Sequence, residues 1–165
     1  MPAEPSLDIE AILRTLAGHG VEFIVVGGVC AVLHGAPVTT FDLDVVHSRG
    51  RKNVVRLLSA LQELDAYCRA QPEKQIRPSK SHLSSAGRQL LMTRFGPLDV
   101  LGLIGEGREY SDLAPHTIEM DVDERLTVRL LDLETLIQTK QETAGEKDLA
   151  VLAILRRILG ERRGP

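Results

Sequence analysis

The chain has 165 residues, a length typical of one domain, and 43% of them are hydrophobic, which is enough to build a core. Charged residues make up 26% and the net charge is −3, which excludes a disordered tail and argues against a protein that binds nucleic acid by bulk electrostatics. Aromatic residues are only 3%, so we expect no stacking platform for single-stranded RNA.

The sequence has no apolar run of roughly eighteen residues, the length of a membrane span. The first residues, MPAEPSLDIE, do not follow the pattern of a cationic segment before an apolar one, so we expect no secretory signal. Cys30 and Cys68 have no CxxC or Cys/His spacing and are expected to be buried free thiols. We therefore expect a cytoplasmic protein that does not contact a membrane.

The first predicted elements are a helix and a strand. Ser6 is expected to cap a helix that ends at Gly18 and Gly20. The run VEFIVV (21–26) is short, apolar and β-branched, which predicts a buried strand.

A second helix and strand follow a pair of glycines. Gly27 and Gly28 end the first strand, and VCAVLHG forms a short helix that stops at Gly35. The run VTTFDLDVV (38–46) reads as the next strand. Apolar residues at helical spacing then predict a helix over about 52–64.

The middle of the chain is predicted to be a loop and a hairpin. Residues 70–88 are polar and contain two prolines, so we expect a loop with at most a short helix. The apolar runs 89–95 and 97–104 read as two strands joined at Gly96.

The last part is predicted to hold two weaker strands, at about 116–122 and 125–130, and two helices. One helix follows Asp132, and the other covers about 146–159 before a frayed tail, ERRGP. The fold class is therefore α/β (α+β): a small mixed sheet flanked by helices. We expect a single domain over 1–165, with its core at about 7–130 and a C-terminal helix pair at about 132–160.

Two carboxylates carry the strongest chemical signal. Asp42 and Asp44 are two residues apart on a predicted strand, so they point to one face while Leu43 and Val45 point into the core. Neighbouring carboxylates on an apolar strand repel each other unless a cation holds them. Mg²⁺ favours a few carboxylates completed by water and phosphate, so this pair predicts a magnesium site.

A third acid and the two glycines complete the pattern. Asp99 also interrupts an apolar strand, and it joins the pair if that strand lies beside 38–46. Three such carboxylates can hold two metal ions about 3.5–4 Å apart. Gly27 and Gly28, at a strand-to-helix junction, allow the backbone to approach a phosphate.

The run FIVVGGVCAVLHGAPVTTFDLDVV resembles the signature of the DNA polymerase β-type nucleotidyltransferase superfamily: a strand, GG or GS, a short helix, then DxD on the next strand. GPLDVLG resembles the segment that carries the third carboxylate of that family. The segment LLDLETLIQTKQETAGEKDLAVLAIL is similar to the tail of its minimal bacterial branch, which includes the AbiEii-type toxin transferases.

The resemblance implies an enzyme that transfers a nucleoside monophosphate from an NTP such as ATP to a hydroxyl group, with two Mg²⁺ ions or with Mn²⁺. It implies that Asp42, Asp44 and Asp99 are catalytic metal ligands. The residues that it implies for binding the nucleotide are Gly27, Gly28, Lys140 and Lys147, with Asp148 orienting a lysine or acting as an acid.

One position departs from the resemblance. Relatives often carry an Arg or Ser shortly before DxD, and Val38 stands in that place here. Either a phosphate contact is missing or another cation replaces it, and the candidates are Arg49, Arg51, Lys52 and Arg94.

Several functions stay open. The acceptor of an active enzyme is a tRNA, a protein or a small molecule, and an antibiotic such as an aminoglycoside or lincosamide is one alternative. The other alternative is a non-catalytic nucleotide-binding module of a toxin–antitoxin pair, with a small protein partner. The non-functional interpretations are that the aspartates are ordinary surface or turn acids and that Lys140 is a solvated helix residue. His34, at a helix end where its charge suits the dipole, and His47 are expected to be structural.

Overall fold

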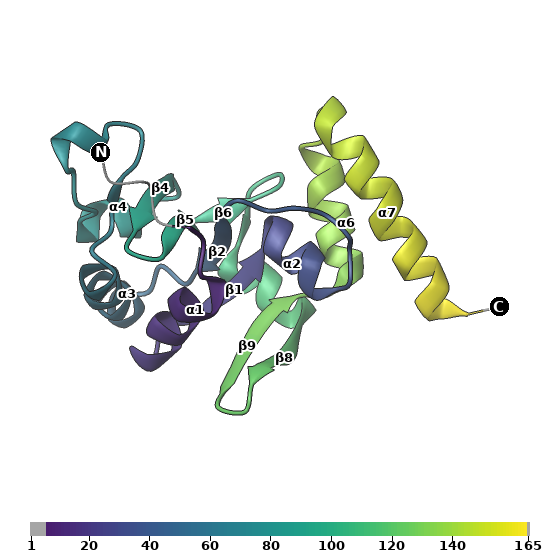
Figure 1. The fold of residues 1–165 in the computed structure, drawn as a ribbon, viewed down its shortest axis with the longest axis horizontal. Coiled ribbons are helices and arrows are strands. Elements are labelled where there is room, and N and C mark those ends of the chain that lie inside the picture. Colours follow the sequence, from purple (N-terminus) through teal and green to yellow (C-terminus); the bar gives the residue numbers. More distant parts are fainter. Residues whose placement is uncertain (1–5, 165) are drawn as a thin grey trace.

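The computed structural model describes residues 6–164, and Figure 1 shows its mixed sheet with helices packed around it. The sheet has seven strands in the order β3-β4-β5-β2-β1-β9-β8 within the described residues. Its strands are β1 (Phe23–Val26), β2 (Leu43–His47), β3 (Tyr67–Cys68), β4 (Arg88–Thr93), β5 (Gly96–Leu101), β8 (Thr117–Asp123) and β9 (Leu126–Leu131). A separate small hairpin pairs β6 (Leu103–Ile104) with β7 (Arg108–Glu109).

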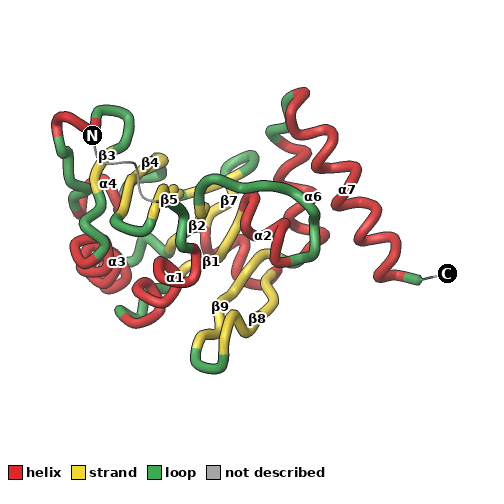
Figure 2. The backbone as a smooth tube through the Cα atoms, viewed as in Figure 1, coloured by secondary structure: helices red, strands yellow, loops and turns green. Residues whose placement is uncertain are grey.

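The helices are α1 (Ile9–Gly18), α2 (Gly27–Leu33), α3 (Arg51–Glu63), α4 (Lys80–Ser84), α5 (Tyr110–Leu113), α6 (Leu133–Glu142) and α7 (Glu146–Arg163). Two 3-10 turns lie at Pro72–Lys74 and Ala114–His116. Figure 2 shows α6 and α7 together at the end of the molecule opposite α3 and α4, and the β8–β9 hairpin projecting between the two ends. The predicted fold class, a mixed sheet flanked by helices with a C-terminal helix pair, is confirmed.

The first helix is capped by Asp8 and not by Ser6, so the predicted cap was wrong. The Asp8 side chain accepts a hydrogen bond from the Ala11 backbone N–H at 3.1 Å. An aspartate two residues nearer the apolar run reaches the unpaired N–H groups of the first turn, and Ser6 does not. The helix ends at Gly18, and Gly20 turns the chain with a φ of +71°.

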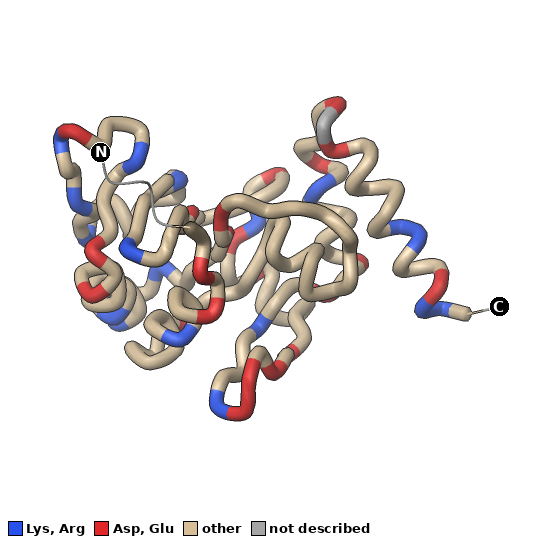
Figure 3. Tube along the Cα trace, in the orientation of Figure 1, with Lys and Arg blue, Asp and Glu red and all other residues tan. Residues whose placement is uncertain are grey.

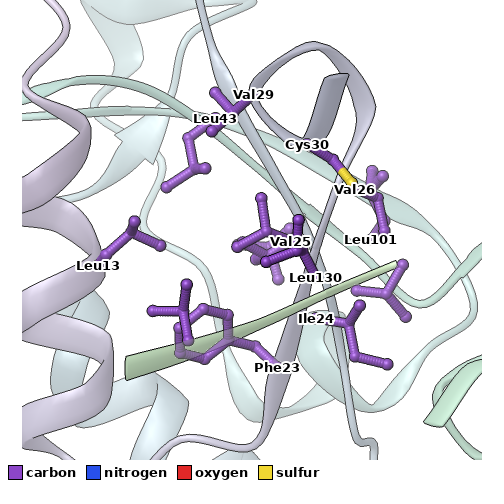
Figure 4. Packing of buried hydrophobic residues seen from close by; sticks show 14 of the residues in the cluster. Leu13, Phe23, Ile24, Val25, Val26, Val29, Cys30, Leu43, Leu101 and Leu130 are labelled. Atoms are coloured by element: carbon purple, nitrogen blue, oxygen red, sulfur yellow. The ribbon is translucent and has the colours of Figure 1, made fainter. Parts of the chain in front are cut away.

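β1 is an interior strand between β2 and β9, and all four of its residues are apolar and buried, as expected of a strand covered on both faces. In Figure 4, Val25 lies close to Leu130 of β9, with Leu13 of α1 and Leu43 of β2 nearby. Each of these four side chains is fully buried, at 0% exposure. The strand predicted over 21–26 forms over Phe23–Val26 and is part of the hydrophobic core.

The strand that carries the aspartates is shorter than predicted. β2 starts at Leu43, and the chain bends at the two residues before it. The Thr40 hydroxyl donates a hydrogen bond to the Asp42 carbonyl oxygen at 3.0 Å, which stabilises a turn in place of an extended strand. Asp42 therefore lies on the turn that leads into β2, and Asp44 lies on β2 itself.

The predicted hairpin forms from β4 and β5, with its turn at Arg94 and Phe95. Gly96 is the first residue of β5 and has a φ of +106°. A Cβ there would lie 2.7 Å from the Leu7 Cα, so the chain preceding α1 closes over this turn. Asp8 also donates its backbone N–H to the Phe95 carbonyl at 2.8 Å.

The polar segment 70–88 is largely a loop, as predicted, with α4 as its short helix. The edge strand β3, just before it, was not predicted. Two residues are too few to show a period in the sequence. This short strand pairs with β4 and fixes the start of the segment against the sheet.

The predicted C-terminal helix pair forms, and its last helix is longer than predicted. Asp132 caps α6 by accepting from the Thr135 N–H at 2.8 Å, and the two helices are packed against each other. The tail was expected to be frayed, but α7 continues to Arg163. Arg163 pairs with Glu134 of α6 at 2.6 Å, so the expectation of a frayed tail was wrong for the described tail residues. None of the helices in the described part of the chain combines the length and hydropathy needed to span a membrane.

Candidate metal and nucleotide site

Three carboxylates converge on one face of the sheet. Asp42 lies on the turn before β2, Asp44 on β2 and Asp99 on β5. One oxygen from each lies within 4.8 Å of the others. The sequence predicted this group of residues, and the parallel pairing of β2 with β5 brings it together.

The alternation of side chains along the two strands explains the convergence. Asp44 and Asp99 are direct partners in the β2–β5 register. Their neighbours Leu43, Val45 and Leu98 are fully buried. Successive side chains of a strand point to opposite faces, so burying these neighbours on one face turns both carboxylates to the other.

The carboxylates are partly removed from water, and this makes their negative charge costly. Burial, followed by the charges of Asp42 and Asp99, raises the pKa of Asp44 to about 8. Burial and then the charge of Asp99 also raise the pKa of Asp42. A bound divalent cation would reverse this cost.

The donor set fits a hard divalent cation. Carboxylate oxygens are the ligands that Mg²⁺ prefers, and two or three of them leave room for water and phosphate in its coordination shell. Within the described residues, Asp42, Asp44 and Asp99 form the one group of three or more metal-ligating side chains.

Gly27 and Gly28 are the first residues of α2 and do not merely end the strand before it, as was predicted. Gly27 has a φ of +67°, and a Cβ on it would lie 2.1 Å from Asp44 Oδ2. A Cβ on Gly28 would lie 2.8 Å from Thr40 Oγ1. Both positions lack a side chain because the Asp44 carboxylate and the turn before β2 occupy the space.

A cleft of about 140 Å³ opens beside Asp44. It is lined by Val26, Gly27, Asp44, Leu101, Ile104, Gly105, Leu136, Thr139, Lys140, Thr143 and Asp148. Lys140 of α6 therefore lies in the same cleft as Asp44, with its Nζ 3.4 Å from Asp148 Oδ1. The side chain of Lys147, also predicted to bind nucleotide, lies outside the described part of the structure.

Arg69, which follows β3, is a cation in contact with the carboxylates that the sequence did not indicate. Its Nη1 donates to Asp99 Oδ1 at 2.5 Å and to the Leu91 carbonyl at 3.0 Å. Its Nη2 lies 3.8 Å from Asp42 Oδ2. The only available signal was a basic stretch, because residues 69–88 contain five Lys or Arg and one acid. Figure 3 shows basic segments at the end of the molecule formed by α3, α4 and β4.

The four cations proposed from the sequence lie elsewhere. Arg49 forms an ion pair with Glu109. Arg51 and Lys52 are exposed at the start of α3, and Arg94 is exposed in the β4–β5 turn. Their described contacts include none with the three aspartates, so Arg69 replaces them as the candidate cation.

The two histidines near the site are held in structural hydrogen bonds. His34 Nε2 lies 2.7 Å from the Leu131 carbonyl and its Nδ1 lies 3.0 Å from Arg162 Nη1. Because arginine can only donate, Nδ1 is an acceptor and the ring is neutral. Burial lowers the pKa of His34, so the expected favourable charge at the helix end was wrong. His47 is also buried, with Nε2 2.7 Å from the Leu83 carbonyl, and burial lowers its pKa.

Comparison with known proteins supports the fold. Neither the protein-family models nor the curated proteins gave a match to the sequence. Among solved structures, a proposed nucleotidyltransferase from Thermotoga maritima is similar, with a TM-score of 0.58 and 18% identity over 93% of this chain and 91% of the other. This likeness shows that the chain has a nucleotidyltransferase fold. The resemblance to the toxin-like branch and the roles of the site residues stay predictions.

Proposed function

We propose that this protein is a magnesium-dependent nucleotidyltransferase that moves a nucleoside monophosphate from an NTP to a hydroxyl group. The observation that carries the proposal is the convergence of Asp42, Asp44 and Asp99 beside a cleft that also contains Lys140. The nucleotidyltransferase fold supports the proposal, since Asp44 and Asp99 lie on adjacent strands of its sheet and Asp42 lies on the turn that leads into one of them.

In the proposed reaction, the acceptor oxygen forms a bond to the α-phosphorus of the NTP. The bond from that phosphorus to the oxygen bridging the α- and β-phosphates breaks, and pyrophosphate leaves with the electron pair. Magnesium ions at the carboxylates would lower the pKa of the acceptor hydroxyl and offset charge on the leaving group.

Each of the protein's own side chains has a separate role in the proposed reaction. Asp42, Asp44 and Asp99 would hold the cations, and Asp99, which is 5% exposed, would also take the proton of the acceptor hydroxyl. Lys140 reaches the cleft from α6 and attracts the phosphates that follow the α-phosphorus. Gly27 leaves room for the Asp44 carboxylate next to the bound nucleotide.

Equilibrium binding of a non-hydrolysable ATP analogue, with and without Mg²⁺, tests the proposal. We expect the wild-type protein to bind the analogue only with Mg²⁺, and Asp44→Asn to abolish that binding. Asp121→Asn is a matched control, because Asp121 is an exposed β8 residue that accepts a hydrogen bond from Thr127 Oγ1, as an asparagine can.

The control variant should bind like the wild type. Magnesium-independent binding, or equal binding by Asp44→Asn, would contradict the proposal. If the analogue binds as expected, transfer of labelled nucleotide to tRNA, protein or small-molecule hydroxyls then identifies the acceptor.

A further inference from the structure

We propose that Arg69 is an exchangeable counter-ion: it neutralises Asp99 and Asp42 in the metal-free protein and turns to the NTP phosphates when the metal binds. This inference rests on the proposed function. It assigns the phosphate-binding cation that the sequence lacks at Val38, and it assigns a second state to the same side chain.

Arg69 and a bound metal ion would use the same carboxylates. Arg69 Nη1 lies 2.5 Å from Asp99 Oδ1, and Asp99 is one of the three candidate ligands. The guanidinium balances one of the three carboxylates and leaves an excess of negative charge. A divalent cation would bind these oxygens more strongly and would repel the adjacent guanidinium.

The two terminal nitrogens of the Arg69 guanidinium are held differently. Nη1 also donates to the Leu91 carbonyl at 3.0 Å, so β4 anchors that end. Nη2 lies 3.8 Å from Asp42 Oδ2, which is beyond hydrogen-bond distance. Nη2 is therefore the weakly bound end, and it can turn to a phosphate oxygen while Nη1 stays on Leu91.

The backbone of Arg69 is fixed to the sheet, while its side chain is partly exposed. Arg69 is 27% exposed, so part of its side chain is accessible to a ligand. Its backbone N–H donates to the Leu90 carbonyl at 3.1 Å, so its main chain is fixed to the sheet. Because its backbone is fixed and its guanidinium is partly exposed, Arg69 can change partners by moving its side chain alone, without a loop movement.

Two binding measurements on Arg69→Gln test the proposal. The first titrates metal-free protein with Mn²⁺ alone and follows free Mn²⁺ by electron paramagnetic resonance. We expect Arg69→Gln to bind Mn²⁺ about three- to fivefold more tightly than the wild type, the effect of removing one competing, partly exposed ion pair. The second measures the non-hydrolysable ATP analogue at saturating Mg²⁺, where we expect the variant to bind about tenfold more weakly through loss of a charged hydrogen bond.

Arg77→Gln is the matched control. Arg77 lies in the same basic segment but pairs with Asp65 at 2.7 Å and stacks on Tyr67. It should leave both affinities unchanged. A folded Arg69→Gln protein that binds Mn²⁺ no more tightly, or the analogue no more weakly, would overturn the role of Arg69 while leaving the proposed function intact. Absence of Mn²⁺ binding by the wild type would instead overturn the proposed function and this inference together.

A measurement on the wild type keeps the test independent of how the variant folds. The guanidinium ¹⁵N signal of Arg69, assigned by its loss in Arg69→Lys, should shift when Mg²⁺ is added and shift again when the analogue follows. A signal that stays unchanged through both additions would overturn the exchange of partners.

Discussion

Asp44 and Asp99 lie directly opposite each other on the parallel strands β2 and β5, although 54 residues separate them along the chain. The site therefore depends on the register between two strands that are distant in sequence. A slip of one residue would turn one carboxylate to the face where Leu43 and Leu98 are buried. The following predictions test this arrangement and the elements that support it.

Gly27→Ala should abolish Mn²⁺ binding. The added Cβ would lie 2.1 Å from Asp44 Oδ2, so the carboxylate must move. The positive φ also strains alanine, at a cost of about 1–2 kcal/mol of unfolding free energy. Thermal unfolding and Mn²⁺ titration check both effects.

Gly35→Ala is the control for strain alone. Gly35 has a φ of +97°, but a Cβ there would meet nothing within 4 Å. This variant should lose a similar stability and keep its Mn²⁺ affinity. Equal Mn²⁺ binding by both alanine variants would show that Gly27 does not protect the Asp44 carboxylate.

The two cysteines should differ in reactivity. Cys30 is fully buried, and burial raises the pKa of its thiol to about 12. Cys68 is half-buried on the edge strand, so the expectation of two buried thiols holds for Cys30 alone. A thiol reagent at pH 8 followed by mass spectrometry should label Cys68 first and Cys30 only after denaturant is added. Rapid labelling of Cys30 in the native protein would contradict its burial.

The contact between Arg108 and Glu142 should stabilise the protein at neutral pH and lose its effect in acid. Arg108 holds the pKa of Glu142 down to about 2, from an ordinary value of 4.5. A lowered carboxyl pKa gives stability that is complete above about pH 4.5 and disappears as the pH falls toward 2. Glu142→Gln should therefore melt at a lower temperature than the wild type at pH 7, and the difference should shrink as the pH falls through this range.

The same contact borders the cleft, because Glu142 also accepts from the Glu106 N–H at 3.1 Å in the β6–β7 turn. Hydrogen exchange of residues 103–109 should speed up in Glu142→Gln. Glu134→Gln, also on α6 but paired with Arg163, is a control that should leave exchange in this turn unchanged. A difference in melting temperature that persists at pH 2 would contradict the ionic origin of the effect.

His34 should make the protein less stable as the pH falls below its ordinary pKa of 6.5. Burial lowers the pKa of His34 in the folded state, so the unfolded chain takes up the proton first. Protonation of Nδ1 would also break the contact with Arg162. Chemical unfolding at pH 7.5 and pH 5.5 should show a smaller loss of stability in His34→Gln than in the wild type. An identical loss of stability in both proteins would mean that the pKa of His34 is the same in the folded and unfolded states.

The sequence predicted the elements whose signal is local. The apolar run at 21–26 indicates a buried strand by itself, so β1 was predicted correctly. Asp44 alternates with Leu43 and Val45, so the orientation of its side chain was also predicted correctly. The strand before Asp42 was predicted too long, because Thr39, Thr40 and Phe41 have high strand propensity. The hydrogen bond from Thr40 to the Asp42 carbonyl overrides that propensity.

Contacts between segments that are distant in the sequence were harder to predict. The place of Asp99 depends on β5 lying beside β2, which a local pattern cannot show. Arg69 was missed because it follows a strand of two residues and reaches a carboxylate 30 positions away. The non-local half of the site therefore needed the three-dimensional arrangement of the sheet.

Arg162 near the end of α7 donates to the carbonyl oxygen of His34 at 2.7 Å, at the end of α2, whose first residue is Gly27 beside Asp44. The same α7 helix begins near Asp148, which lines the cleft. Truncating the chain before Arg162 would remove this contact and should loosen α7. The first turn of the same helix borders the cleft beside Asp44. If the proposed function holds, a preparation clipped in α7 should bind the ATP analogue more weakly than the intact chain, even with every carboxylate in place.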